Sequence, residues 1–152
     1  MKVLNEMEMT FDALSVNEGF ARVCVASFCV QLNPSLDEIT DIKTAVSEAV
    51  TNAVVHAYPN RTGCVTLKVQ ILPENEIVIE VKDSGVGISD FEKAREPFFT
   101  TRSTEERSGM GFTVMESFMD KLELSKNGAG GVKVVMYKKI GRSYAKTKAA
   151  ND

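Results

Sequence analysis

Glu48 and Asn52 stand four residues apart in a segment that predicts a long amphipathic helix, so their side chains share one helical face. The row that they form lies roughly 100° from the apolar stripe, at its border, where side chains can face a cleft. An Asn amide oxygen suits a Mg²⁺ ion that keeps most of its waters, and a Glu carboxylate can accept a proton from an attacking hydroxyl. His56, the only histidine, continues the row, and a packed or hydrogen-bonded role is its default. For any of the three residues alone, a solvated polar edge is the simpler interpretation.

A second candidate segment follows the strand predicted over residues 77–82. Asp83 opens the turn Asp-Ser-Gly-Val-Gly, in which Gly85 and Gly87 allow backbone conformations closed to other residues and leave room for a flat ring. The Asp83 carboxylate can accept a hydrogen bond from the exocyclic amine of adenine. A turn of this composition is a weak signal by itself, because it is more often only a turn.

A third segment, Gly109-Met110-Gly111, opens a predicted helix. Free backbone amides at a helix N-terminus favour anions, and glycines let a phosphate come close. Arg107 can add a charge-assisted contact to a terminal phosphate, although a solvated charge beside two glutamates is the alternative. Residues 88–108 lack sustained periodicity, as is typical of a functional or mobile loop, and they include the polar donors Thr100 and Thr101. Together the three segments predict one nucleotide site.

The elements that position these residues are predicted to form a two-layer α/β sandwich of the α+β class, with helices on one face of a mixed, mostly antiparallel sheet. The helix over residues 36–58 has Ser35 and Asp37 as candidate N-caps, and Pro59 ends it. The other expected elements are a strand through Met7, Met9 and Phe11, a helix after Ser15 that buries Phe20, Val23, Cys24 and Phe28, strands over 65–72 and 77–82, a helix from Gly109 to about Asp120 that buries Phe112, Met115 and Met119, and strands over 122–125 and 132–137.

Composition predicts one domain over residues 1–140, followed by a basic tail over 141–152 that we expect to be solvated and frayed. The net charge is −3; five basic residues and one acid from Lys138 onward carry +4, which leaves −7 on the rest and argues against nucleic-acid binding as the main task. No apolar run approaches a membrane span and no signal peptide is evident, so we expect a cytoplasmic protein. The three cysteines lack zinc-like spacing and are expected to be reduced.

The order of the three motifs resembles the ATP-binding fold shared by gyrase, Hsp90-type chaperones, histidine kinases and MutL mismatch-repair proteins, the Bergerat-type fold. Within it, the chain is most similar to small serine kinases that double as anti-sigma factors. Three segments look especially like the anti-sigma-F factors of endospore-forming bacteria, namely residues 17–22, 46–53 and 106–112. The likeness covers about residues 5–140.

This resemblance implies a dimeric cytoplasmic kinase that uses ATP and Mg²⁺. In its ATP form it would hold a sporulation sigma factor of the F type inactive, and it would phosphorylate a serine of an anti-anti-sigma factor. Carried over by position, the resemblance implies a general base at Glu48 and a magnesium ligand at Asn52. It implies an adenine contact at Asp83, in a pocket shaped by Gly85 and Gly87, and a contact for both protein partners at Arg22. The implied phosphate lid includes Thr100, Thr101, Arg107, Gly109, Met110 and Gly111. Members of the family that this chain resembles usually carry Thr where this chain has Val132, so one hydroxyl expected beside the adenine ring is absent.

Four alternatives share parts of this pattern. General-stress anti-sigma kinases, of the sigma-B type, have the same site. A gyrase-like or Hsp90-like ATPase module would use Glu48 to activate water, and a two-component kinase would place phosphate on a histidine. The fourth alternative is a nucleotide-gated binding module without kinase activity.

Overall fold

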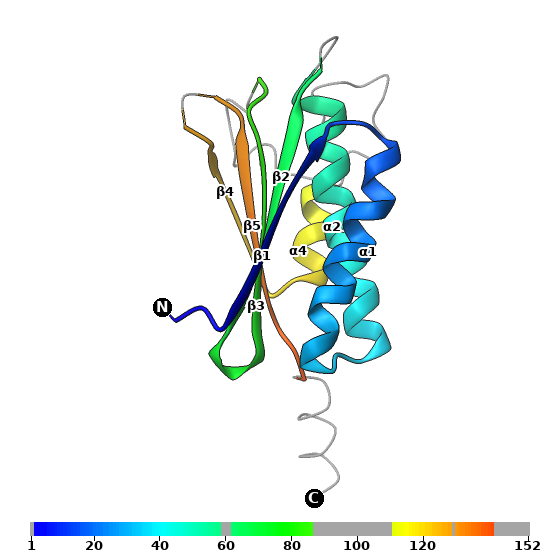
Figure 1. Ribbon diagram of the computed structural model, residues 1–152, viewed down its shortest axis with the longest axis vertical. Helices are drawn as coiled ribbons and strands as arrows, with labels where there is room; N and C mark the ends of the chain where they lie inside the picture. Colours follow the sequence, from blue (N-terminus) through cyan, green and yellow to red (C-terminus); the bar gives the residue numbers. More distant parts are fainter. Residues whose placement is uncertain (1, 59–61, 87–110, 129, 142–152) are drawn as a thin grey trace, which may run out of the picture.

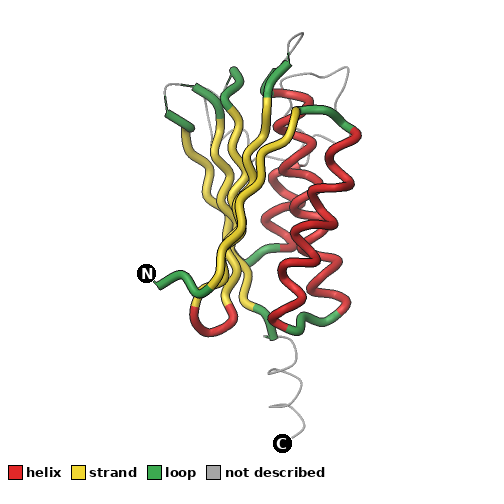
Figure 2. Tube along the Cα trace, viewed as in Figure 1, coloured by secondary structure: helices red, strands yellow, loops and turns green. Residues whose placement is uncertain are grey.

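The computed structural model describes residues 2–58, 62–86, 111–128 and 130–141. Over these residues the chain forms two layers, a sheet and a layer of helices that covers one of its faces (Figures 1 and 2). In chain order the elements are β1 (Asn5–Asp12), α1 (Val16–Cys29), the short η1 (Val30–Leu32), α2 (Leu36–His56), β2 (Cys64–Leu72), the short η2 (Pro73–Asn75), β3 (Glu76–Asp83), α4 (Gly111–Phe118), β4 (Lys121–Lys126) and β5 (Val132–Lys139).

The sheet has the strand order β1-β2-β3-β5-β4, and every pairing among the described strands is antiparallel. The predicted α+β sandwich with helices on one face is therefore confirmed. β5 is inserted between β3 and β4, and Lys82 of β3 pairs with Lys133 of β5. Because the two strands run in opposite directions, the end of β3 at Asp83 lies beside the start of β5 at Val132. This crossing brings together two segments that are far apart in the sequence.

Helix α2 lies at the centre of the helical layer (Figure 1). Its start is a capping box: the Ser35 side chain accepts a hydrogen bond from the Glu38 amide, and the Glu38 carboxylate accepts one from the Ser35 amide. The predicted N-cap is confirmed, and the helix ends at His56, two residues before the predicted end. Its apolar stripe is buried against the sheet and the neighbouring helices, at Ile42, Ala45, Val46, Ala49, Val50 and Ala53.

The prediction for the buried face of α1 is wrong for Phe20 and Val23, whereas Cys24 is partly buried as is Phe28. The residues that the helix buries are Ala21, Val25, Ala26 and Cys29. Phe20 is 60% exposed and Val23 is 53% exposed, while Phe28 is partly buried. The physical reason is the close packing of α1 on α2, where small side chains on both helices fit and a phenyl ring does not. Ser15 precedes α1, but its side chain makes no capping hydrogen bond.

Helix α4 packs beside α2, and its predicted buried face is confirmed, since Met115 and Met119 are buried and Phe112 is partly buried. The part of the helix predicted at Gly109 and Met110 lies outside the described residues. None of the helices among the described residues is long and apolar enough to cross a membrane.

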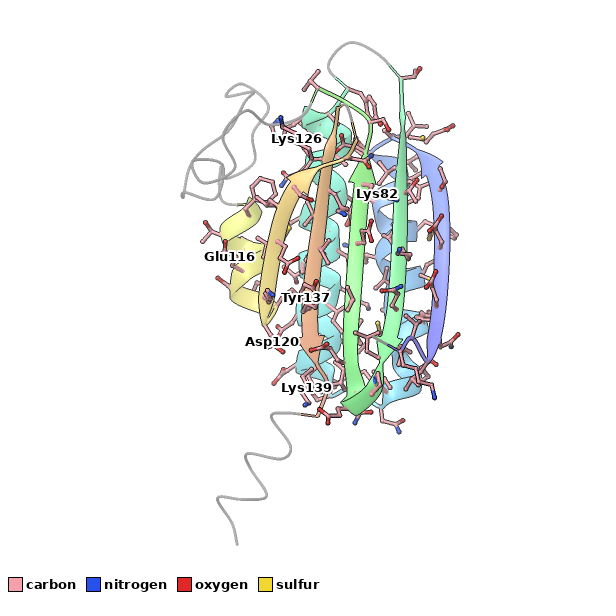
Figure 3. The ribbon with its side chains drawn as sticks, turned by 90° about the vertical axis from the view of Figure 1, so that its left-hand side faces the viewer. Lys82, Glu116, Asp120, Lys126, Tyr137 and Lys139 are labelled. Carbon is pink, nitrogen blue, oxygen red and sulfur yellow. The ribbon has the colours of Figure 1, made fainter. Side chains whose placement is uncertain are left out.

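The face of the sheet opposite the helices is polar (Figure 3). Lys68 pairs with Glu80 across β2 and β3, with 3.5 Å between Nζ and Oε2. On β4 and β5, Lys121 lies over the ring of Tyr137, with its Nζ 5.2 Å from the ring centre. Polar cross-strand pairs therefore occupy the face away from the helices, and the apolar side chains of the sheet face the helical layer. A site between helices and sheet can form only on that second face.

Candidate active site

The row predicted on α2 lies at the edge of the helix that is neither buried nor fully exposed. Glu48, Asn52 and His56 are all half-buried, whereas Ala49 and Ala53 beside them are buried. The row therefore borders the core, where the apolar periodicity placed it. Its polar ends can reach a ligand without any movement of the helix.

The structure brings the start of α4 against this row. A Cβ atom added at Gly111 would lie 2.9 Å from Nδ2 and 3.2 Å from Oδ1 of Asn52. Any larger residue at position 111 would push the Asn52 amide aside. Gly111 of the third predicted motif thus lies beside Asn52 of the first, and Glu48 is one helical turn away on α2.

Asp83 lies at the other end of the site and is only 6% exposed. Its Oδ1 accepts hydrogen bonds from the backbone amides of Gly85, at 2.9 Å, and Val132, at 3.2 Å. Its Oδ2 has no hydrogen-bond partner among the described residues. Burial raises the pKa of the Asp83 carboxyl, and the two backbone hydrogen bonds oppose that shift. A buried carboxylate oxygen without a partner is a suitable acceptor for a ligand amine.

Two glycines allow close backbone packing at this end, because a side chain at either position would collide with a neighbouring backbone carbonyl. A Cβ at Gly85 would lie 2.0 Å from the carbonyl oxygen of Ala57, which accepts a hydrogen bond from the Val86 amide at 2.9 Å. Gly131 has a φ of +83°, and a Cβ there would lie 2.1 Å from the carbonyl oxygen of Asp83. The turn after β3 is therefore packed on the end of α2 on one side and on the turn before β5 on the other.

Tyr58 and Asn127 are residues of this region that the sequence did not single out. The Tyr58 hydroxyl donates to the carbonyl oxygen of Cys64, at 2.8 Å, and accepts from the amide of Ser84, at 2.7 Å. The Asn127 amide donates to the carbonyl oxygen of Asp83, at 2.7 Å. Together they tie the end of α2 and the turn before β5 to the ends of β2 and β3. The local sequence carries no signal for them beyond a tyrosine before Pro59 and an Asn-Gly turn.

Arg22 lies on α1, away from Asp83 and on the side of Glu48. Its Nη1 is 3.5 Å from Oε1 of Glu18, and the Ser47 hydroxyl donates to the same oxygen. A cavity of about 350 Å³ opens between α1 and α2 at this point. Its lining includes Arg22, Ser47 and Glu48, so the predicted partner contact and the predicted base border one hollow. Sequence reasoning missed Glu18 and Ser47, whose link joins residues from two helices.

Six predicted site residues lie outside the described residues and stay predictions, namely Gly87, Thr100, Thr101, Arg107, Gly109 and Met110. Within the described residues, no group of three or more His, Cys, Asp and Glu side chains could hold a metal ion. Two features fit an adenine nucleotide: the buried Oδ2 of Asp83, which has no hydrogen-bond partner within the described part of the chain, and the closeness of Asn52 to Gly111.

Comparisons with known proteins identify the family. A family model of the histidine kinase-like ATPase domain matches residues 12–138. The anti-sigma F factor of Caldanaerobacter subterraneus subsp. tengcongensis is 55% identical over 143 residues, which cover 94% of this chain and 99% of that protein. The chain belongs to the anti-sigma F factor family. The family member from Clostridium acetobutylicum is 54% identical, over 90% of this chain and 94% of its own length. The resemblance that the motifs indicated is confirmed, and the domain family implies the use of ATP.

Two solved structures share this fold. The RsbU and RsbW domains of Rv1364c from Mycobacterium tuberculosis match with a TM-score of 0.64 at 18% identity, over 90% of this chain and 32% of that one. The mycobacterial sensor histidine kinase MprB matches with a TM-score of 0.57 at 16% identity, over 87% of this chain and 97% of that one. At these identities the likeness shows the fold alone.

Proposed function

We propose that this protein is an anti-sigma factor and a protein-serine kinase of the cytoplasm. In its ATP form it binds and inhibits a sporulation sigma factor of the F type, and it transfers phosphate to a serine of an anti-anti-sigma factor. The observation that carries the proposal is the contact between Asn52 and the first residue of α4, with Glu48 one helical turn away. Membership of the anti-sigma F factor family supports it.

The chain offers separate groups for the two ends of ATP. The Oδ2 of Asp83, for which the described residues supply no donor, would accept a hydrogen bond from the adenine amine. Backbone amides around Gly111 would bind phosphate oxygens, because amides near a helix N-terminus favour anions. Asn52 would ligate Mg²⁺ through its amide oxygen; when bound, the ion neutralises phosphate charge. From the part outside the described residues, Gly87 would shape the adenine pocket, and Thr100, Thr101, Arg107, Gly109 and Met110 would cover the phosphates.

Glu48 would act on the acceptor. Phosphoryl transfer depends chiefly on the positioning of the groups and on charge stabilisation, and the protein adds a base for the acceptor hydroxyl. The Glu48 carboxylate would accept the proton of the substrate serine as its oxygen attacks the terminal phosphate. Because Glu48 is on the same rigid helix as Asn52, base and metal ligand keep a fixed separation of one turn.

The surface of α1 supports binding of protein partners. Val16 and Phe20, one helical turn apart on α1, form a short stripe of exposed apolar side chains, with exposed fractions of 79% and 60%. A contiguous apolar stripe of this kind is typical of a protein interface. We assign the stripe to a second copy of the chain, because β1 at the same edge of the molecule is an edge strand. Phe20→Asp should then halve the mass measured by light scattering, and an unchanged mass would refute this interface.

The experiment that tests the function uses the purified protein on a resin with the cognate sigma factors and anti-anti-sigma factors. With Mg-ATP we expect retention of the F-type sigma factor, and with Mg-ADP we expect its loss. Addition of labelled ATP should place phosphate on a serine of the anti-anti-sigma factor. Retention of a general-stress sigma factor would reassign the pathway. Binding without any phosphate transfer would show a non-enzymatic module, and phosphate released only to water would show an ATPase.

A further inference from the structure

The polar row on α2 does not end at Glu48. At the same four-residue spacing it continues towards the start of the helix through Thr44 and Thr40, and the Thr44 hydroxyl donates to the Thr40 carbonyl oxygen at 2.9 Å. Each step along the row advances about 6 Å along the helix axis. Glu48 therefore stands between Asn52, one turn further along, and Thr44, one turn back. The proposed base separates two regions of one helix edge.

The region on the Thr44 side is hollow. The cavity of about 350 Å³ between α1 and α2 is lined by Arg22, Val23, Thr40, Lys43, Thr44, Ser47 and Glu48. Its walls carry three hydroxyls, two cations and one carboxylate. The volume lies within the range of sites that hold a small ligand or a few side chains, about 300 to 1,000 Å³. Glu48 forms one end of this cavity, so a group bound in it lies beside the proposed base.

The two cations of the cavity differ in their partners. Arg22 is engaged by Glu18, whose carboxylate also accepts a hydrogen bond from Ser47. Lys43 is half-buried and makes no ion pair with any residue that the structure describes. A half-buried ammonium beside several hydroxyls favours an anionic group from outside the chain. The cavity is therefore complementary to an acidic side chain.

We infer that this cavity binds the segment of the protein substrate that flanks the acceptor serine, and that Lys43 pairs with an acidic side chain of that segment. The inference rests on the proposed function, because it takes Glu48 as the base. It follows from the order along α2: the nucleotide occupies the Asn52 side, so an acceptor that approaches Glu48 from the opposite side lies over Thr44 and Lys43. Lys43 is a specificity-determining residue for the protein substrate.

The test compares Lys43→Glu and Lys43→Arg in the full chain. For Lys43→Glu we expect the Kd and the KM for the anti-anti-sigma protein to rise about tenfold or more, with kcat within about twofold and ATP affinity unchanged. Lys43→Arg keeps the charge, so its Kd and KM should stay within about threefold of the parent values. The salt dependence of KM should weaken in Lys43→Glu, because an attractive pair screened by salt is gone. Lys121→Glu, the same change on the exposed face of the sheet, is the matched control and should leave all values as they are.

The outcomes separate this inference from the proposed function. If the parent protein phosphorylates the substrate and Lys43→Glu does so with unchanged Kd and KM, the cavity does not bind the substrate. If Lys43→Glu weakens only the sigma factor, the occupant has been assigned wrongly. If the parent protein transfers no phosphate at all, the proposed function fails, and the Kd for the anti-anti-sigma protein still decides whether Lys43 contacts it.

Discussion

The two ends of the nucleotide site are built in different ways. At the adenine end, Asp83 is buried, its Oδ1 is held by two backbone amides, and Gly85 and Gly131 are packed against backbone carbonyls. At the proposed phosphate end, Glu48 and Asn52 are half-buried side chains at the border of the apolar face that stabilises helix α2. The comparison teaches that the proposed adenine pocket is formed by the packing of the fold itself, whereas the proposed chemical groups are side chains at the edge of one helix. Substitutions at the two ends should therefore affect different measurements.

The largest effect is expected at the phosphate end and only on the rate. Glu48→Gln keeps the shape of the side chain but removes the proton acceptor, so phosphate transfer should fall about 10²- to 10⁴-fold. ATP affinity and the urea midpoint should stay unchanged, because Glu48 is not part of the core. Single-turnover transfer and nucleotide titration measure the two quantities. Transfer at a near-normal rate would remove Glu48 from the mechanism, and Glu8→Gln on β1 serves as the surface control.

The second effect is expected at the adenine end and on stability. In Gly131→Ala the new Cβ must displace the Asp83 carbonyl and accept a φ of +83°, so the free energy of unfolding should fall by about 2 to 4 kcal/mol. Gly128 also has a positive φ, +64°, but nothing lies within 4 Å of the position of its Cβ. Gly128→Ala should therefore lose only about 1 to 2 kcal/mol, the conformational part. Equal losses in urea denaturation would mean that the close approach to Asp83 is not important.

Asp83 itself should affect nucleotide affinity and stability together. In Asp83→Asn one of the two oxygens becomes an NH₂ group, which cannot accept from both the backbone amides and the ligand. A lost buried hydrogen bond of about 1 to 3 kcal/mol corresponds to about a 5- to 150-fold weaker nucleotide affinity, measurable by calorimetry. Asp12→Asn, at the exposed end of β1, should leave the affinity unchanged.

The pH dependence of Asp83 gives two opposite slopes. Burial raises the pKa of Asp83 in the folded chain above the ordinary value of 3.8, which applies to the unfolded chain. At a pH between the unfolded and the folded pKa, the folded chain therefore binds more protons than the unfolded chain. The contribution of Asp83 to the free energy of unfolding should therefore fall as pH rises through that window. Nucleotide affinity should rise over the same window, because the ligand amine needs the ionised carboxylate. Asp83→Asn should remove both contributions, and parallel slopes in denaturation and binding would contradict this account.

How much the sequence could predict also differs between regions. The row on α2 was predictable because apolar periodicity, the Ser35 cap and Pro59 all act locally and agree with the tertiary packing. The buried face of α1 was not predictable from the size of its apolar side chains, since the structure buries Ala21 and Ala26 and exposes Phe20. Which side of a helix is inside depends there on the distance to α2, which the local pattern does not contain.

Residues that close the adenine end were missed for a related reason. Tyr58, Asn127 and Gly131 each contact backbone of residues that are distant in sequence. The contacts of Asn127 and Gly131 exist only because β5 pairs with β3, and those of Tyr58 exist because the end of α2 lies against the ends of β2 and β3. Neither arrangement is encoded in any one segment. Asp83 could be identified because its neighbours in the sequence form a recognisable turn, although the turn alone does not reveal that its Oδ1 is used by the fold.

The smallest expected effect concerns Val132, at the position where the resemblance drawn from the sequence implies a Thr. Val132 is 8% exposed, and its backbone amide already donates to Asp83 Oδ1, a contact that does not need a hydroxyl. Val132→Thr should therefore add at most one hydrogen bond near the adenine ring. Such a bond contributes about 0.5 to 1.5 kcal/mol, which corresponds to a nucleotide affinity up to about tenfold tighter. Val134→Thr places the same hydroxyl two residues further along β5, in the core, and should lower the urea midpoint without any gain in affinity. If Val132→Thr also leaves nucleotide affinity unchanged, Asp83 and backbone groups alone make the adenine contact at this edge. The proposed adenine end would then depend on the packing of the backbone and not on the side chain at position 132.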